Sequence, residues 1–161
     1  MLEIKNLTVK VKNNAPILTD VSLSIDEGTC IGLTGASGSG KTTLIKSIMG
    51  MNGGDLEIPQ GQILLDGDNL LTHSAKERRM LCGETIGFIP QNPMTAFFPH
   101  AKMERQIIET LRMHTGLDKK QAHALAENVL RKVNLTDTKR VLRAYPGELS
   151  GGMLQRIAMA L

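Results

Sequence analysis

The sequence predicts an α/β fold in which a strand-rich N-terminal part precedes a helical part. Apolar and polar residues alternate over Leu2–Val11 and over Val21–Ile25, as they do in strands with one buried face. A glycine-rich loop, Gly35–Gly40, stands between a short apolar run and a helical pattern. From Ala101 onward, apolar residues recur at helical spacing. We therefore expect a β-rich N-terminal edge followed by an inserted helical subdomain.

The elements expected in the first part are a buried strand over Thr29–Thr34, a helix over Lys41–Met51, a strand over Gln62–Gly67, a helix over Ser74–Leu81 and a strand over Thr85–Ile89. The short apolar run TCIGLT is typical of a strand buried in a parallel sheet. Ser74, with Glu77 three residues later, forms a capping-box pattern. Pro90 cannot donate to a strand ladder and ends the last strand.

The helices expected in the later part cover Ala101–Thr115, Asp118–Val133 and Asp137–Leu142, and a last helix begins at Ser150. Gly116 suits the end of the first of these helices, and Asp118 with Gln121 forms a second capping box. Strands give way to helices near Gln91. We expect three regions: 1–90 with the glycine-rich loop, 91–145 as the helical subdomain, and 146–161, which contains the Leu149–Met153 motif and the first part of the last helix.

Composition narrows the classes of function. The chain has 161 residues, 41% of them hydrophobic and 22% charged, as in a globular protein, and its net charge is only +3. Aromatic residues make up 2%, too few for the stacking platforms that bind single strands, so we expect no nucleic acid partner. No apolar run approaches the ~18 residues of a membrane-spanning helix. The start has no signal-peptide layout, and Cys30 and Cys82 have no metal-site spacing. These features predict a soluble cytoplasmic protein.

The strongest motif is the run Gly35-Ala36-Ser37-Gly38-Ser39-Gly40-Lys41-Thr42. It fits G-x-x-x-x-G-K-[ST] and lies between an expected strand and an expected helix, which is the context the motif requires. Glycines let successive backbone N–H groups surround a phosphate, and the helix start adds the positive end of its dipole. Lys41 supplies a charge for the outer phosphates, while the Thr42 hydroxyl can bind Mg²⁺.

Two weaker motifs follow. In Leu149-Ser150-Gly151-Gly152-Met153, the serine can cap the last helix and the glycines expose N–H groups at its start. Gln91 directly follows the expected strand that ends at Ile89, where an amide oxygen can reach Mg²⁺ or a water. Each alone suits an ordinary cap or a surface loop; their combination with the glycine-rich loop favours a nucleotide site.

These three motifs, in this order, resemble the ATP-binding subunits of ABC transporters over the whole chain. The resemblance identifies the glycine-rich loop as the Walker A motif, Gln91 as the Q-loop glutamine and Leu149–Met153 as the signature, which usually reads LSGGQ. The stretches QNPMTAFFP and YPGELSGGM look like those of the oligopeptide, dipeptide and nickel importers. Residues near the signature, Arg140-Val141-Leu142 and Met153-Leu154-Gln155-Arg156, resemble the nickel-import ATPase.

The resemblance implies a P-loop NTPase core that binds ATP and Mg²⁺ and hydrolyses ATP to drive uptake of a peptide or nickel-type substrate. Lys41 and Gln91 would act in catalysis, and Thr42 and Gln91 would hold the metal. The ATP-binding residues would be Gly35, Ala36, Ser37, Gly38, Ser39, Gly40, Lys41, Thr42, Thr43 and Val11, with Ser150, Gly151 and Gly152 serving the ATP of the partner subunit.

The family also implies partners and a location. Two such subunits, identical or paralogous, enclose two ATP molecules, and their helical subdomains dock on transmembrane permease subunits. The protein would then lie at the cytoplasmic face of the cell membrane as a peripheral subunit. A soluble ABC-type ATPase of DNA repair or translation, or a non-catalytic truncated remnant, would share the same motifs.

The sequence departs from the family pattern in two places. The position near the end of the first strand where the family often stacks an aromatic ring on adenine falls on Val11. The Walker B aspartate, the catalytic glutamate and the switch histidine lie after the signature helix in the family, beyond Leu161. We therefore expect the C-terminal part of the core to be missing from these 161 residues, and the 161-residue chain alone to be inactive.

The histidines suggest a nickel site, given the family, but they lack metal-ligand spacing. We expect them to face solvent: His73, His100, His114 and His123.

Overall fold

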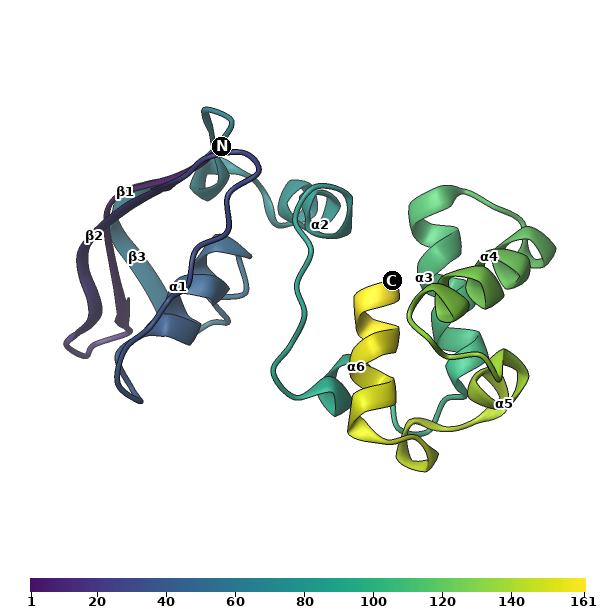
Figure 1. Cartoon of the computed structure of the whole chain (residues 1–161). Coiled ribbons are helices and arrows are strands. Elements are labelled where there is room, and N and C mark those ends of the chain that lie inside the picture. Colours follow the sequence, from purple (N-terminus) through teal and green to yellow (C-terminus); the bar gives the residue numbers. More distant parts are fainter. The chain divides into compact units, whose positions relative to one another are not determined.

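The computed structural model describes residues 1–161, apart from the side chain of Arg79. The chain folds as two compact units, Met1–Ile86 and Gly87–Leu161 (Figure 1). Each unit has its own hydrophobic core. The division lies a few residues before Gln91, where the sequence suggests that strands give way to helices.

A four-stranded antiparallel sheet forms the first unit. Its strands are β1 (Leu2–Val11), β2 (Pro16–Ile25), β3 (Leu56–Leu65) and β4 (Asp68–Asn69), in the order β2-β1-β3-β4. Ile4 pairs with Leu23 on one side and with Ile63 on the other, so β1 is a central strand, and its Ile4, Leu7 and Val9 are buried. The expected β-rich edge is confirmed. β3 begins at Leu56, earlier than expected, because its first residues pair with the end of β1.

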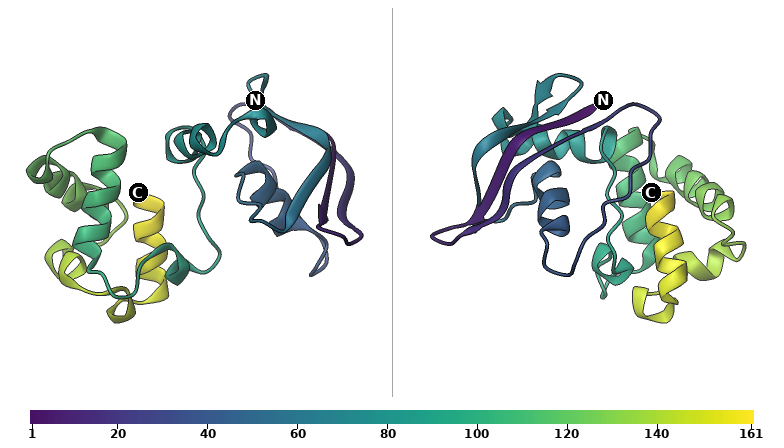
Figure 2. Two further views of the ribbon diagram at one scale, coloured as in Figure 1. Left: turned by 180° about the vertical axis from the view of Figure 1, so that it is seen from behind. Right: turned by 60° about the vertical axis from the view of Figure 1, so that its left-hand side comes forward.

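One helix covers the core of this sheet. α1 (Lys41–Ile48) lies beside the sheet in both views of Figure 2. Its Leu44 is buried with Leu7, Val9 and Ile63 of β1 and β3. The burial of these apolar side chains fixes α1 against the sheet, and thereby fixes the position of the loop that precedes α1.

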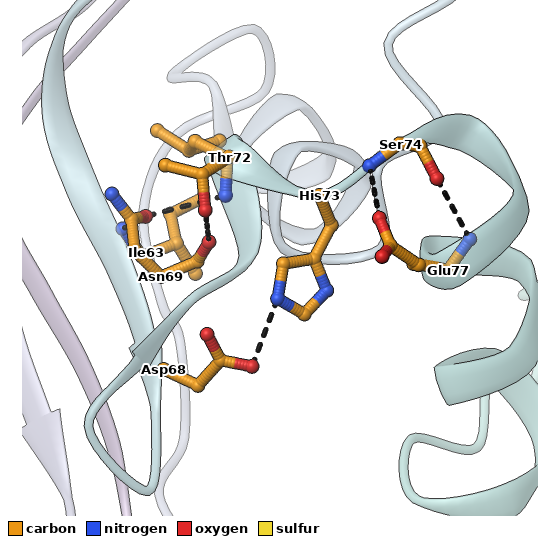
Figure 3. A network of polar contacts seen from close by, with 8 residues as sticks. Ile63, Asp68, Asn69, Thr72, His73, Ser74 and Glu77 are labelled. Carbon is orange, nitrogen blue, oxygen red and sulfur yellow. Dashed lines mark hydrogen bonds and ion pairs between the residues drawn. The ribbon is translucent and has the colours of Figure 1, made fainter.

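A polar network joins the end of β3 to the start of α2 (Figure 3). Asn69 caps the short helix η1 (Leu70–Thr72), and Nε2 of His73 lies 2.8 Å from a carboxylate oxygen of Asp68. Ser74 and Glu77 form the expected capping box of α2 (Ala75–Glu84). The prediction that His73 faces solvent is wrong: its side chain is only 19% exposed because it packs in this turn.

Two expected strands are absent from the described structure. Thr29–Thr34 has no regular secondary structure, and Thr85–Ile89 contains only a single bridge at Ile86. Most of their apolar side chains are exposed, such as Ile31 at 50%, whereas Ile86 is half-buried against the core of the sheet unit. A strand of a parallel sheet depends on neighbours at both edges, and no described strand pairs with these segments.

The second unit is helical. Its elements are η2 (Pro93–Ala96), α3 (Met103–Thr115), α4 (Lys119–Lys132), α5 (Thr138–Arg143), η3 (Pro146–Glu148) and α6 (Gly151–Ala160). The predicted caps are confirmed: Gly116 ends α3 in the left-handed conformation, Asp118 and Gln121 form a capping box, and Ser150 caps α6. Apolar faces of α3, α4, α5 and α6 share one core, which includes Met103, Ala126 and Leu154.

Candidate phosphate-binding site

The first backbone N–H groups of α1 point out of the helix start, and among the described residues no side chain caps them. Gly40 is the N-cap residue, and the first turn carries no acidic side chain. The first intrahelical bond runs from Leu44 N–H to the Gly40 carbonyl oxygen, at 2.9 Å. The N–H groups of Lys41, Thr42 and Thr43 precede that bond. A helix start of this kind, with the positive end of the dipole behind it, attracts anions.

Glycine is required at Gly40 for two reasons. Its φ of +89° is a left-handed conformation that other residues adopt only at a cost. A Cβ atom at this position would also lie 2.5 Å from Cδ2 of Leu18. The loop therefore enters α1 in close contact with β2, which places the helix start beside the sheet.

Lys41 folds its side chain back over the loop. Its Nζ lies 2.8 Å from the Gly35 carbonyl oxygen, 2.7 Å from that of Ala36 and 3.4 Å from the Ser39 hydroxyl. These three contacts match the three donors of an ammonium group. They hold a full positive charge at the loop, next to the uncapped N–H groups.

Thr42 and Thr43 occupy the first turn of α1 in different surroundings. Thr42 is exposed, whereas Thr43 is half-buried. The Thr43 carbonyl oxygen accepts a hydrogen bond from the buried Ser47 hydroxyl, at 2.9 Å, which braces this turn. Of the two threonines, Thr42 is thus the one whose hydroxyl is more open to solvent or to a ligand at the helix start.

The hairpin end of β1 and β2 lies next to the loop. Lys10 pairs with Pro16, and a Cβ atom at Gly40 would lie 3.3 Å from Cγ2 of Ile17. Val11 ends β1 at this hairpin and is half-buried. Ile17 is an exposed apolar residue beside the loop that the sequence analysis did not single out. No strand pattern marks it, because its significance depends on the packing of β2 against Gly40.

The donor set around the loop suits a polyphosphate with a bound hard cation. It offers backbone N–H groups, the Lys41 ammonium and the hydroxyls of Ser37, Ser39, Thr42 and Thr43, and Asp or Glu occurs at none of positions 35–43. Anionic oxygens accept from all these donors, and a hydroxyl oxygen is a ligand that Mg²⁺ accepts beside phosphate oxygens. The residues therefore fit ATP with Mg²⁺. Elsewhere, no group of three His, Cys, Asp or Glu side chains among the described residues lies close enough together to hold a metal ion.

A second helix start lies in the helical unit. The Ser150 hydroxyl accepts from Met153 N–H at 3.3 Å, and Leu149 before it is buried. Gly151 and Gly152 are exposed, and a Cβ atom at either would meet nothing within 4 Å. Packing within the described chain therefore does not explain why both are glycines, in contrast to Gly40.

The predicted site residues divide between the two units. Val11 and the run 35–43 belong to the first unit, where the hairpin contact with Gly40 brings them to one region. Gln91 and Ser150–Gly152 belong to the second. Gln91 is exposed and directly precedes Asn92, whose side chain caps η2 by accepting from Met94 N–H at 3.1 Å.

Relatives of known name match the chain from end to end. It is 35% identical over 162 residues to the metal-staphylopine import system ATP-binding protein CntD of Staphylococcus aureus, covering 100% of this chain and 59% of the relative. It is 37% identical to the nickel import ATP-binding protein NikD of Pseudomonas putida, with 100% and 60% covered. It is 35% identical to the dipeptide transport ATP-binding protein DppD of Lactococcus lactis, with 100% and 47% covered. The chain thus spans about half to three-fifths of these relatives.

Solved structures and a family model agree with the relatives. The dimeric ATP-binding cassette MJ0796, in a post-hydrolysis state bound to ADP and Pi, has a TM-score of 0.83 and 25% identity, covering 99% of this chain and 68% of that one. The expected fold class, part of an α/β ATPase cassette, is therefore confirmed. The ABC transporter family model matches residues 18–161, which include the loop, Gln91 and the signature. The chain belongs to the ABC transporter family, and its relatives include ATP-binding subunits of peptide, nickel and metal importers.

Proposed function

We propose that this chain is part of the ATP-binding subunit of an importer and that it binds ATP with Mg²⁺ at residues 35–43. The observation that carries this proposal is the uncapped start of α1 with the Lys41 ammonium held over the loop. Hydrolysis in the complete protein would drive the uptake of a peptide or nickel-type substrate. The names of the relatives support this substrate class, since they include importers of dipeptides, nickel and metal-staphylopine.

The residues of the loop would take distinct roles. The N–H groups of Gly38 to Thr43 would surround the phosphates, and Lys41 would exchange its contacts with Gly35 and Ala36 for the outer phosphate oxygens. Thr42 would bind Mg²⁺, which neutralises charge on the phosphates when bound. Val11 and Ile17 would cover one face of the base with apolar surface. Gln91 would contribute its amide oxygen to the metal or to a water.

The signature would serve the ATP of a second subunit, whether identical or paralogous. Gly151 and Gly152 leave open space at the start of α6, so a phosphate held by a neighbour can approach the helix backbone. The dimeric solved relative supports this arrangement. The helical unit would dock on transmembrane permease subunits at the cytoplasmic face of the membrane. No helix among the described residues has the length and apolar character needed to cross a bilayer.

The test compares two lysines of the same helix in the full-length protein. Lys41→Ala removes charge-assisted contacts of about 1.5–3 kcal/mol and should weaken ATP binding roughly ten- to a hundredfold in calorimetry. Lys46→Ala removes the same charge from an exposed position of α1 and should leave ATP affinity within about twofold, since exposed charges contribute little. Equal ATP affinity of wild type and Lys41→Ala would refute the proposal.

A further inference from the structure

The side chain of Arg156 connects the first turn of α6 to the turn that follows α4. Arg156 is a half-buried residue of α6, one turn after the two exposed glycines. Its Nε donates to the Gly152 carbonyl oxygen at 3.3 Å. Its Nη1 donates to the carbonyl oxygens of Val133, at 3.5 Å, and of Asn134, at 3.3 Å. One guanidinium group thus binds the backbone of two elements that are distant in the sequence.

The turn after α4 has carbonyl groups that need such a donor. Asn134 adopts a left-handed φ of +60°, and the N–H groups of Asn134 and Leu135 each donate back into the last turn of α4 at 3.0 Å. These two bonds form a Schellman motif, which leaves the following carbonyl groups without a helical partner at the negative end of the helix dipole. Arg156 supplies both the donor and the positive charge to two of these groups, those of Val133 and Asn134.

The first turn of α6 has little of its own to hold it against the rest of the helical unit. Gly151 and Gly152 contribute no side chain, and a Cβ atom at either would meet nothing within 4 Å. The Ser150 hydroxyl accepts from Met153 N–H, but this bond lies within the turn itself. The bonds of Arg156 run from the turn to α4, and they therefore fix the position of Gly152 relative to another helix.

The charge of Arg156 also lies near the start of α6. Side chains of a helix lean toward its N-terminus, and the contact of Nε with Gly152 places the guanidinium beside the first turn. That turn carries no acidic side chain, and within the described part of the chain Arg156 takes part in no ion pair. Its charge therefore adds to the positive end of the helix dipole.

We propose that Arg156 is a positioning residue for ATP hydrolysis. It holds the start of α6 where the N–H groups of the signature meet a phosphate bound by a second subunit. This inference rests on the proposed function, in which the signature serves the ATP of that subunit. A displacement of about 1 Å in groups that bind a reacting phosphate can lower the rate about a hundredfold, so the turn must be held by a fixed support. A planar guanidinium, whose donors point in fixed directions, provides one.

The test is Arg156→Lys in the full-length protein, assembled with its partner subunits. Lysine keeps the charge, but its single ammonium ends nearer the helix than Nη1 does and cannot bind both Gly152 and the end of α4. Phosphate release should fall about tenfold or more, because the donors for the phosphate are displaced. ATP affinity in calorimetry should be unchanged, since residues 35–43 belong to the other unit. Wild-type phosphate release by Arg156→Lys would overturn the proposal.

Arg131→Ala is the matched control for the loss of a contact at the end of α4. Arg131 lies in the last turn of α4, where its side chain pairs with Glu127 at 2.7 Å. Its removal takes away a cation from the same region and leaves the bonds of Arg156 in place. Phosphate release by Arg131→Ala should equal that of the wild type, and a loss as large as that of Arg156→Lys would show that only the charge of this region matters.

Asp118→Ala separates positioning from stability. It removes the capping box of α4 and should lower the melting temperature at least as much as Arg156→Lys, without touching Arg156. We expect wild-type phosphate release from Asp118→Ala, and faster amide exchange over residues 151–155 only in Arg156→Lys. An equal loss of phosphate release in both variants would reduce Arg156 to a structural role. A wild-type protein that binds no ATP would instead refute the proposed function.

Discussion

Gly40 and Leu18 are in such close contact that a Cβ atom at position 40 would lie 2.5 Å from Cδ2 of Leu18. Leu18 is itself buried in the core of the sheet unit. The phosphate-binding loop and β2 therefore depend on the same packing. A change at this contact should alter the stability of the sheet unit and the geometry of the loop together.

Gly40→Ala should destabilise the protein more than Gly38→Ala. Both positions have positive φ, +89° and +82°, so alanine meets backbone strain of about 1–2 kcal/mol at each. A side chain at Gly38 would meet open space, whereas at Gly40 it would displace Leu18 and add about 1–3 kcal/mol of overpacking. Denaturant unfolding of the full-length variants measures the difference. Combining Gly40→Ala with Leu18→Ala should cost less than the sum of the two single changes, and strict additivity would contradict the contact.

Val11→Tyr should strengthen ATP binding. Val11 ends β1 at the hairpin beside Gly40, and an aromatic ring there would stack on the base, a contact of about 0.5–1.5 kcal/mol. The expected gain is roughly two- to tenfold in affinity by calorimetry. Lys12→Tyr, at the next position in the chain, is the control. A gain for Lys12→Tyr but not for Val11→Tyr would mean that the stacking position is misplaced.

Local signals in the sequence predicted the helices and caps well. Ser74 with Glu77, Asp118 with Gln121 and Gly116 each determine structure through neighbours three or four residues away, and all three were confirmed. Strand β1 and the second half of β2 were also predicted, because alternation of apolar and polar residues indicates a single buried face. The runs Thr29–Thr34 and Thr85–Ile89 were predicted wrongly because an apolar run reports only the tendency to be buried, whereas a parallel strand also needs distant partners.

The sequence predicted the motif of the phosphate-binding site but not the side chains that pack around it. The glycine-rich loop and Lys41 follow from spacing alone. The contacts of Gly40 with Leu18 and Ile17 arise between residues more than twenty positions apart in the sequence. Nothing in one sequence distinguishes Leu18 and Ile17 from other apolar side chains. Gly151 and Gly152 were recognised by resemblance, and the structure adds that packing within this chain does not require them.

Helix α2 should lose part of its stability at low pH through Glu77. Hydrogen bonds from the Ser74 side chain and then from its backbone lower the pKa of Glu77 below the ordinary 4.5. A lowered pKa means that the ionised Glu77 carboxylate stabilises the folded state. This stabilisation is fully present above pH 4.5 and is lost as the pH falls through the lowered pKa. Glu77→Ala should therefore speed amide exchange in α2 at neutral pH and have a smaller effect in acid. Ser74→Ala should cost about 1 kcal/mol. An equal effect of Glu77→Ala at both pH values would contradict this linkage.

A polypeptide of residues 1–161 should bind hydrophobic dyes and not turn over ATP. Ile31 and Leu33, in the run that forms no strand, are 50% and 43% exposed. The double variant Ile31→Ser, Leu33→Ser should bind less dye at an unchanged melting temperature, because these side chains lie outside the core.

The same polypeptide should not turn over ATP, because no carboxylate follows the signature within residues 1–161 to hold Mg²⁺ or polarise water. Phosphate release by residues 1–161 that depends on Lys41 would contradict the expected lack of ATP turnover.

Gly152→Ala should stabilise the fold while lowering ATP hydrolysis by the full-length protein. Alanine is the better helix former by up to about 1 kcal/mol, and a Cβ atom at Gly152 would meet nothing within 4 Å in this chain. The only expected obstruction is to the phosphate of a neighbouring subunit at the start of α6. Thermal unfolding should therefore shift upward, and phosphate release should fall about tenfold or more. Met159→Ala, at an exposed position of the same helix, should leave phosphate release unchanged. If Gly152→Ala hydrolyses ATP at the wild-type rate, the open space at the signature serves no ligand, and its glycines have no role in the site.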